Sequence, residues 1–198
     1  MNYRVLVTSI YLLTTVAVAQ DVTPVQLPDV KVGDTWTYVD LDRYTKQVKG
    51  EWTFEVVGVD DSSIKIESRM NGKISARAYG RDWSDSDNFQ PLSFPMQVGK
   101  KWKSRISYNS DCGRTTDDLE AEIKGWEDIE VPAGKFRALR IEHNVFYTGT
   151  RCEGGQKNRW YWYVPSLKRF VRGEARSYTS RGQLEVVEVF ELKASSVQ

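Results

Sequence analysis

EVPAGKFRALRIEH, residues 130–143, is the stretch that decides the fold, and it carries the only histidine of the chain, His143. The segment Val131–Gly134 has turn chemistry, because its proline pre-sets φ at the second turn position and its glycine accepts a left-handed backbone at the fourth. Pairing Val131 with Lys135 places residues of the same parity opposite each other. The stretch therefore predicts a β-hairpin.

The odd positions on both sides of this turn form a nearly continuous apolar face. They are Leu119, Ala121, Ile123, Ile129, Val131, Leu139, Ile141, His143, Val145 and Tyr147. Most even positions are charged, and this alternation is typical of a sheet with one dry and one wet face. Gly125 and Glu127 interrupt the apolar series, so we expect a β-bulge near Gly125.

Period-two alternation recurs along the chain, separated by turn residues. Apolar residues alternate with charged or polar ones in 52–56, 63–70 and 101–108, with the inward sets Trp52, Phe54, Val56, then Ile64, Ile66, Met70, then Trp102, Ile106, Tyr108. The segments 159–165, 169–179 and 184–192 continue as a meander. The fold class predicted is all-β: a curved antiparallel sheet of about ten strands, as an open barrel or a two-layer β clam.

The first 19 residues resemble a cleaved export signal. A short basic start precedes an apolar run at 5–19, and Ala17-Val18-Ala19 fits the small-x-small cleavage pattern. The run is shorter than the about 20 residues that a spanning helix needs. We expect a periplasmic or secreted bacterial protein with no transmembrane segment after signal cleavage.

The rest of the chain is expected to hold one domain. It divides into a flexible arm at 20–29, a single β domain at 30–193 and a tail at 194–198. Two weak internal similarities suggest that the domain has two similar halves, 30–95 and 96–193. VKVGDTWTY (30–38) resembles MQVGKKWKS (96–104), and FEVVGVDD (54–61) resembles AEIKGWED (121–128), at nearly the same offset.

Charge argues against nucleic acid as a partner. The chain has 28 Lys and Arg against 27 Asp and Glu, and removal of Arg4 with the signal would leave the two signs balanced. A neutral chain without a basic run lacks the electrostatic footprint of a nucleic-acid-binding protein.

Two cysteines, Cys112 and Cys152, lie in polar loops that contain glycine. In an exported protein such a pair is expected to form a disulfide. Two cysteines and one histidine do not make a zinc site, and neither cysteine has the C-x-x-C redox spacing. We therefore predict a structural bridge.

Four stretches together resemble a family of uncharacterised bacterial envelope proteins, some of them labelled TapB-like. They are VGDTWTY (32–38), PLSFPMQVGKKW (91–102), GWEDIEVPAGKFRALRIE (125–142) and WYVPSLKRFVRGE (162–174). The family features are a V-P-A-G-x-F turn and a W-Y-x-P strand end. Where members commonly have P-G-x-G, this chain has Pro165-Ser166-Leu167-Lys168. The resemblance implies an exported β-sheet protein and transfers no catalytic residue.

The sequence is poorly equipped for the common catalytic and metal chemistries. His143 is in mid-strand, and no G-x-S-x-G motif accompanies it. Asp82, Asp85, Asp87 and Asn88 are close in sequence, but their spacing does not match a calcium loop. We predict no catalytic residue, no metal and no cofactor.

Carboxylates are the remaining route to an enzyme, as a hydrolase acting on envelope glycans. Glu120 and Glu122 share a charged strand face, where carboxylates make poor general acids. Glu188 lies among apolar positions of its strand, and Arg172 or Arg176 on the preceding strand could pair with it. A buried ion pair is the role predicted for Glu188.

Aromatic residues give the leading functional hypothesis. The chain has seven Trp and ten Tyr, and RWYWY (159–163) alternates Trp160 and Trp162 with two tyrosines. Aromatic faces exposed in a groove suit lipid chains or sugars, although a large-residue core is the alternative. We predict a non-enzymatic envelope protein that binds an apolar or amphipathic ligand, or a protein partner, on a concave β surface lined by Trp160, Trp162 and His143. A structural subunit of an envelope assembly is a further alternative.

Overall fold

The computed structural model describes residues 23–85 and 89–198. The predicted signal peptide at 1–19 lies outside these residues, as do Asp87 and Asn88. Within the described part, ten antiparallel strands form one curved sheet, and the only other regular element is a 3-10 turn, η2 (Pro165–Leu167). The all-β prediction and its strand number are confirmed.

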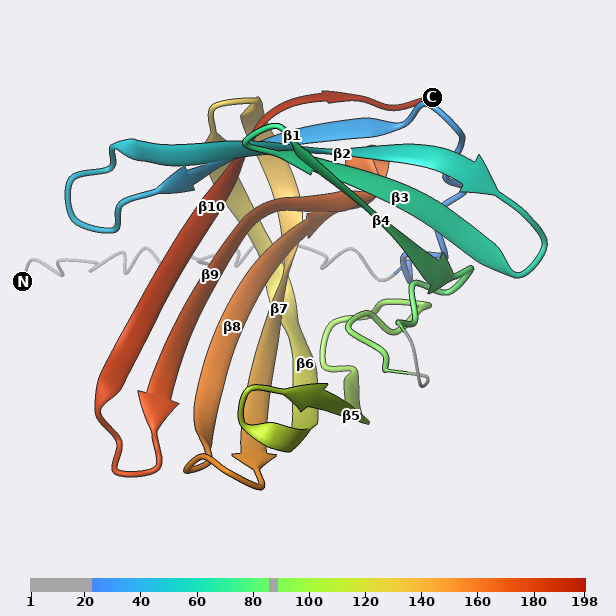
Figure 1. Cartoon of the computed structure of the whole chain (residues 1–198). Helices are drawn as coiled ribbons and strands as arrows, with labels where there is room; N and C mark the ends of the chain where they lie inside the picture. Colours follow the sequence, from blue (N-terminus) through green and yellow to red (C-terminus); the bar gives the residue numbers. More distant parts are fainter. Residues whose placement is uncertain (1–22, 86–88) are drawn as a thin grey trace, which may run out of the picture.

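The chain runs through the sheet as two meanders (Figure 1). The strands are β1 (Thr35–Leu41), β2 (Val48–Val59), β3 (Ser63–Met70), β4 (Lys73–Gly80), β5 (Lys101–Ser110), β6 (Gly113–Val131), β7 (Gly134–Gly149), β8 (Gly155–Val164), β9 (Arg169–Thr179) and β10 (Leu184–Ser196). Their order in the sheet is β4-β3-β2-β1-β10-β9-β8-β7-β6-β5, so β4 and β5 are the two edges.

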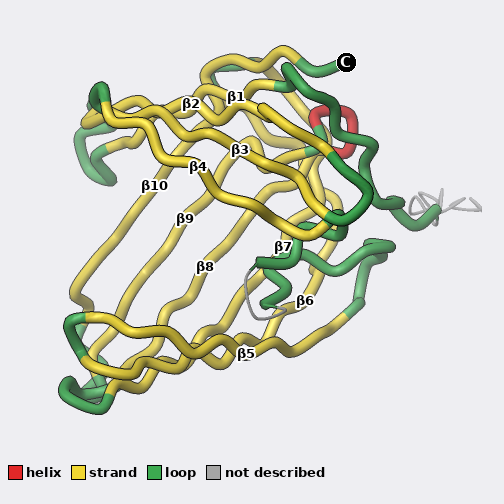
Figure 2. Tube along the Cα trace, turned by 45° about the vertical axis from the view of Figure 1, so that its right-hand side comes forward, coloured by secondary structure: helices red, strands yellow, loops and turns green. Residues whose placement is uncertain are grey.

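The sheet folds over without closing. Figure 2 shows β1–β4 above, β10 to β7 as the back wall, and β5 crossing below. The largest core cluster joins the two layers, because it contains Trp36 of β1, Val56 of β2, Leu139 of β7 and Leu192 of β10. The sheet is thus an open clam whose inner faces share a core.

The β6–β7 hairpin forms as predicted, with one correction to its register. Val131 pairs with Gly134 and not with Lys135, so the loop has only two residues. A shift between Ile123 and Gly125, the predicted bulge, restores same-parity pairing below it. Below the bulge, Ile123 lies opposite Ile141 and the predicted apolar face is on the inside of the sheet. Above the bulge, odd residues of β6 pair with even residues of β7, so Ile129 and Val131 lie opposite Phe136 and Gly134 and do not share the face of Leu139 that was predicted for them.

Two residues predicted to face inward are exposed. Met70 is 53% exposed and Tyr108 is 39% exposed, although each occupies the expected parity position. Met70 ends β3 beside the turn into β4, and Tyr108 is near the end of edge strand β5. Alternation fixes the face on which a side chain lies, but burial also requires a neighbour above it, and the ends of edge elements lack one.

The similarity between the two predicted halves has a counterpart in backbone hydrogen bonds. Gly33 and Gly99 both have positive φ, 93° and 84°. Gly33 N–H donates to the Val56 carbonyl over 2.9 Å, and Gly99 N–H donates to the Ile123 carbonyl over 2.8 Å. The same turn thus precedes β1 and β5, while duplication of the entire halves stays a prediction.

The segments flanking the β domain are held by specific contacts. Val25, in the arm predicted to be flexible, forms an isolated β-bridge with Met96. At the other end, β10 continues to Ser196, and the Gln198 N–H donates to the Asp34 carboxylate over 2.9 Å. Backbone hydrogen bonds, which composition does not reveal, attach both segments.

Asp34 is fully buried and organises the junction between β1 and the end of the chain. Its carboxylate accepts hydrogen bonds from the Lys31 N–H, the Gln198 N–H and the Lys168 ammonium, each over 2.9 Å. Burial raises the pKa of Asp34, but these donors outweigh it and hold the pKa below its ordinary value. Lys168 has φ 58°, a left-handed conformation at the position where the resembled family has its second glycine.

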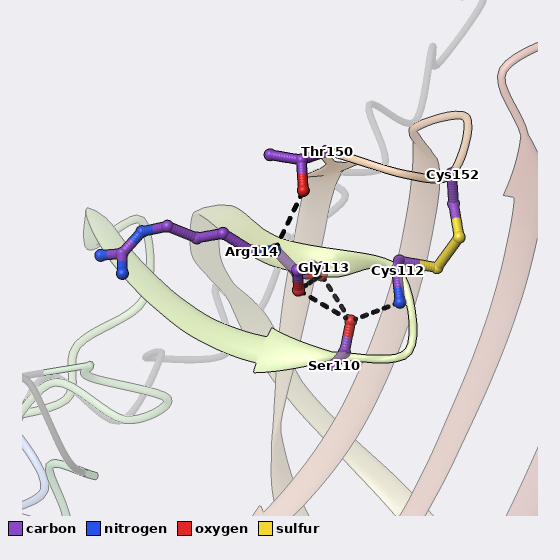
Figure 3. Close-up of a disulfide and its surroundings, with 7 residues drawn as sticks. Ser110, Cys112, Gly113, Arg114, Thr150 and Cys152 are labelled. Carbon is purple, nitrogen blue, oxygen red and sulfur yellow. Dashed lines mark hydrogen bonds between the residues drawn. A yellow bond between two sulfur atoms is a disulfide. The ribbon is translucent and has the colours of Figure 1, made fainter.

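The predicted disulfide joins Cys112 and Cys152 (Figure 3). It links the β5–β6 turn to the β7–β8 loop at one end of the sheet. A backbone hydrogen bond reinforces the same junction, since Arg151 N–H donates to the Cys112 carbonyl over 2.9 Å. Within the β5–β6 turn, the Ser110 hydroxyl accepts from Cys112 N–H over 3.1 Å.

Leu139→Asp is expected to unfold the protein. Leu139 is 1% exposed in the main core, and removing a buried leucine side chain costs about 2–5 kcal/mol before the penalty of an unpaired buried carboxylate is added. Far-UV circular dichroism at 25 °C should show loss of the sheet signal. The matched control is Phe146→Asp on the opposite face of β7, where the side chain is 50% exposed; a folded Leu139→Asp protein would contradict this core assignment.

Removing the disulfide is expected to destabilise the fold without abolishing it. The bridge closes a loop with a sequence separation of 40, which corresponds to about 4 kcal/mol in the chain-entropy model, an upper value. The double variant Cys112→Ala, Cys152→Ala should unfold at lower urea concentration than the oxidised protein. Dithiothreitol should lower the midpoint of the parent and leave that of the variant unchanged, whereas equal midpoints for both proteins would refute a stabilising role.

Candidate functional site

A row of rings crosses the inner face of the sheet, and we call it the aromatic row. Its members, in spatial order, are Trp52 (β2), Tyr38 (β1), Phe190 (β10), Tyr161 (β8), His143 (β7) and Trp102 (β5). Successive ring centroids are 5.8, 5.4, 6.4, 5.0 and 6.0 Å apart. These separations are within or near the range of favourable aromatic contacts. The row therefore connects the upper layer to edge strand β5.

Small residues on the two intervening strands allow these rings to meet. On β9, Gly173 lies between Phe190 and Tyr161, and a Cβ there would be 2.3 Å from the Phe190 ring. On β6, Ala121 lies between Trp102 and His143. The alternation of large and small residues across neighbouring strands thus lets each ring extend over the strand beside it.

The row borders the main core along one edge, and along the other edge it borders charged residues on β8 and β10 and a second core cluster, with Leu119 and Val145, on β6 and β7. Along the edge of the row nearer the β6–β7 loop, Tyr163 and Leu139 belong to the main core. Along the other edge, its outer side, Arg159 lies opposite His143 on the same face, and Glu188 lies on that face two strands away, across Ala175. Trp52, Tyr161, Phe190 and Trp102 are half-buried. This face therefore offers accessible ring surface next to charge.

His143 is 3% exposed, between the rings of Tyr161 and Trp102. Burial, together with the positive charge of Arg159, lowers the pKa of His143 to about 3, although the backbone of Pro91 acts in the opposite direction. The imidazole is neutral at physiological pH, and its Nε2 has no hydrogen-bond partner among the described residues. A neutral ring in this position acts as part of the aromatic row.

The structure does not bring the three predicted lining residues together. Trp160 and Trp162 lie on the opposite face of β8 from Tyr161, which contacts His143. Trp162 donates its indole N–H to Glu127 over 2.9 Å, and the Arg176 guanidinium lies 5.2 Å from the Trp160 ring. Both tryptophans belong to a charged outer surface, and their predicted part in lining a concave site with His143 does not fit this placement.

The ion pairs formed within residues 23–85 and 89–198 do not include Glu188 with Arg172 or Arg176, the partners predicted for it. Arg172 pairs with Glu174 and, over 3.4 Å, with Glu191. The physical reason is parity: Glu188 points to the inner face, while Arg172 and Arg176 point to the outer face. The Glu188 side chain is also exposed.

Of the six rings in the row, only His143 was predicted from the sequence as a lining residue, and the meeting of all six was not predicted. The alternation in RWYWY separates Tyr161 from the tryptophans, and the hairpin parity places His143 inside, but the pairing of β7 with β8 is needed to join them. Trp52 and Trp102 were predicted to face inward, and they do. Nothing in the local pattern relates β2 to β10. The two strands are neighbours of β1 in the sheet, and β1 pairs with β10 from the opposite end of the described chain.

Two observations, on metal sites and on membrane-spanning helices, apply to the described residues alone. Between residues 23 and 85 and between 89 and 198, no group of three or more His, Cys, Asp and Glu side chains is arranged to hold a metal ion. In the same part of the chain, no helix is long and apolar enough to cross a membrane.

Comparison with known proteins gives a fold and no family. No family model and no curated protein sequence matches the chain, so the TapB-like resemblance stays a prediction. Among solved structures, a Bacteroides fragilis protein described as exported and YmcC-like in fold aligns with a TM-score of 0.52 at 14% identity, over 88% of this chain and 100% of that one. A Parabacteroides distasonis protein described as a lipoprotein aligns with the same TM-score and identity, over 89% and 100%. The likeness shows the fold shared with these proteins.

The low pKa of His143 predicts a specific loss of stability in acid. Between the unfolded pKa near 6.5 and the folded pKa of about 3, the unfolded chain binds a proton that the folded protein excludes, so stability falls as pH falls through this window. From pH 7 to pH 5, the loss from this residue is roughly 2 kcal/mol. Urea unfolding at both pH values should show that the free energy of unfolding falls by this amount more in the parent than in His143→Phe. Parallel pH dependence of the two proteins would contradict a buried neutral imidazole.

Proposed function

We propose that this protein is an exported, non-enzymatic protein of the bacterial cell envelope whose concave face binds an apolar or amphipathic ligand. The observation that carries the proposal is the aromatic row, because it leaves half-buried rings on the inner face of an unclosed sheet. Buried apolar surface contributes about 25 cal/mol per Å², so a ligand that covers these rings gains most of its affinity there.

The arrangement of charge favours an amphipathic ligand over a wholly apolar one. Arg159 and Glu188 lie on the same face as the rings, at their outer side. A ligand with an apolar body and a polar end can cover the rings and leave its polar end beside these charges. A fully apolar ligand would desolvate both charged groups without replacing their hydrogen bonds, which is costly.

Three observations support an envelope location. The first 19 residues have the pattern of an export signal, and two of the solved structures that align with the chain are described as an exported protein and a lipoprotein. A disulfide also fits an oxidising compartment. We accordingly propose that the mature protein acts in the periplasm or after secretion.

The alternative of a carboxylate hydrolase has less support. Glu120 and Glu122 lie on the outer face, beside Lys103 and Lys101 of β5. A hydrogen bond from Lys124, the largest influence, lowers the pKa of Glu122. A general acid needs a raised pKa, so this pair is tuned in the wrong direction.

The proposal is tested with N-phenyl-1-naphthylamine, an uncharged fluorescent probe of apolar sites. The protein should bind the probe saturably, with increased and blue-shifted emission. Phe190→Gln should weaken binding roughly 2- to 10-fold, since one aromatic contact contributes about 0.5–1.5 kcal/mol.

The matched control is Trp160→Gln, which removes a large ring from the opposite face of the sheet. It should bind the probe like the parent, and circular dichroism should show that both variants are folded. No saturable binding to the parent, or equal weakening by both variants, would refute the concave face as the binding surface.

A further inference from the structure

A small cavity lies apart from the aromatic row, between the end of β4, the segment that follows it and the start of β9. Its volume is about 130 Å³, and its walls include Tyr79, Trp83, Leu92, Arg169 and Phe170. Phe170 stacks on Tyr161 with ring centroids 4.5 Å apart, so it separates the cavity from the row. The cavity is below the about 300–1,000 Å³ of drug-sized ligand pockets, and only a small molecule fits it.

Arg169 brings a positive charge to this cavity without a carboxylate to balance it. Its guanidinium carbon lies 5.1, 4.5 and 5.3 Å from the ring centroids of Trp36, Phe54 and Trp83. In the part of the chain that the structure describes, no ion pair includes Arg169, whereas the next arginine, Arg172, pairs with two glutamates. Aromatic faces stabilise the cation, and the Tyr38 hydroxyl oxygen accepts one hydrogen bond from it, so most of its five N–H groups are left for a ligand.

Trp83 adds a second donor. The side chain is 5% exposed, and its indole Nε1 is buried with no hydrogen-bond partner among the described residues. Its backbone has φ 66°, a left-handed conformation that is uncommon for a bulky residue and is held by the Trp83 N–H hydrogen bond to the Gly80 carbonyl over 2.9 Å. A buried indole N–H usually finds a partner, so this residue is held in place with its donor unused.

The two donors and the apolar walls define a ligand chemistry. A guanidinium and an indole N–H both donate, and neither accepts, so the complementary group is an anion with at least two acceptor oxygens. Leu92, Phe170 and Tyr79 offer apolar surface to a short alkyl part. Lys168 also lines the cavity, but its ammonium is paired with Asp34 over 2.9 Å, so a single negative charge matches Arg169, the one unpaired cation among the described lining residues.

We propose that this cavity binds a small monocarboxylate, whose oxygens accept from Arg169 and Trp83 and whose alkyl part packs against Leu92 and Phe170. This site is independent of the proposed function, because a four-carbon acid is confined to the cavity by Phe170 and need not touch the aromatic row. Binding of a small acid and binding of a lipid-like ligand are therefore separate properties.

The test is a titration of the ¹⁵N-labelled protein with sodium butyrate at constant ionic strength, followed by nuclear magnetic resonance. One indole N–H resonance should shift saturably, and this resonance should be missing from the spectrum of Trp83→Phe. Butyramide, which has nearly the same shape without the charge, should cause no saturable shift. An equal shift with butyramide, or with sodium chloride alone, would overturn the carboxylate assignment.

Two variants and one control locate the site, with affinity measured from the backbone amides of Leu92 and Phe170. Arg169→Gln should weaken butyrate binding at least 10-fold, and Trp83→Phe should weaken it about 3- to 10-fold. Arg181→Gln, which removes an exposed arginine that pairs with Glu153, should leave it unchanged. If Arg169→Gln does not fold, Trp83→Phe decides; butyrate affinity equal to that of the parent in a folded Trp83→Phe protein would overturn the proposal.

Butyrate should leave binding of N-phenyl-1-naphthylamine unchanged within twofold. This measurement separates the two proposals. Loss of probe binding with butyrate binding intact would refute only the concave face, and the reverse would refute only the cavity. Full competition between butyrate and the probe would overturn the cavity as a separate site.

Discussion

Pairing between β6 and β7 is the constraint on which the rest of the structure depends. These two strands form the longest ladder in the sheet, and the same-parity face of their lower part supplies Leu119, Ile123 and Ile141 to the inside. A one-residue slip would turn every one of these side chains to the opposite face. The two-residue loop pairs odd residues of β6 with even residues of β7. The bulge before Gly125 shifts the register by one residue, so that odd residues pair with odd residues below it.

The inner face that this register defines continues across the whole sheet. Gly173 and Ala121 leave room for Phe190, Tyr161, His143 and Trp102 to reach over their strands, so a curved sheet with an open edge can still carry a continuous layer of rings. The outer face follows the opposite principle. There, Arg172 pairs with glutamates and lies over the Trp162 ring, so charged side chains cover the aromatic rings of that surface. The difference between the two faces explains why only the inner one is a candidate for binding.

The fold was predictable from sequence to a large extent, and the site was not. Period-two alternation in 63–70 and 169–179 gave strands whose bounds match β3 and β9, since alternation is a local consequence of backbone geometry. The disulfide between the two cysteines was equally predictable from the sequence. Trp160 and Trp162, however, were predicted to line a concave face with His143, and parity alone cannot say which face of a later strand is inside. The same limit explains why Arg172 was paired with Glu188, which lies on the other face.

The sequence by itself determined the all-β class, the main hairpin with its bulge, the disulfide and the near balance of positive and negative charge, because each depends on neighbouring residues or on composition. Only the tertiary structure decided which rings meet, that Arg169 lies among three aromatic rings without a carboxylate, and that Gln198 binds Asp34. These contacts join residues far apart in the chain. Their geometry depends on the strand order and on the curvature of the sheet, and no local pattern of residues specifies either one.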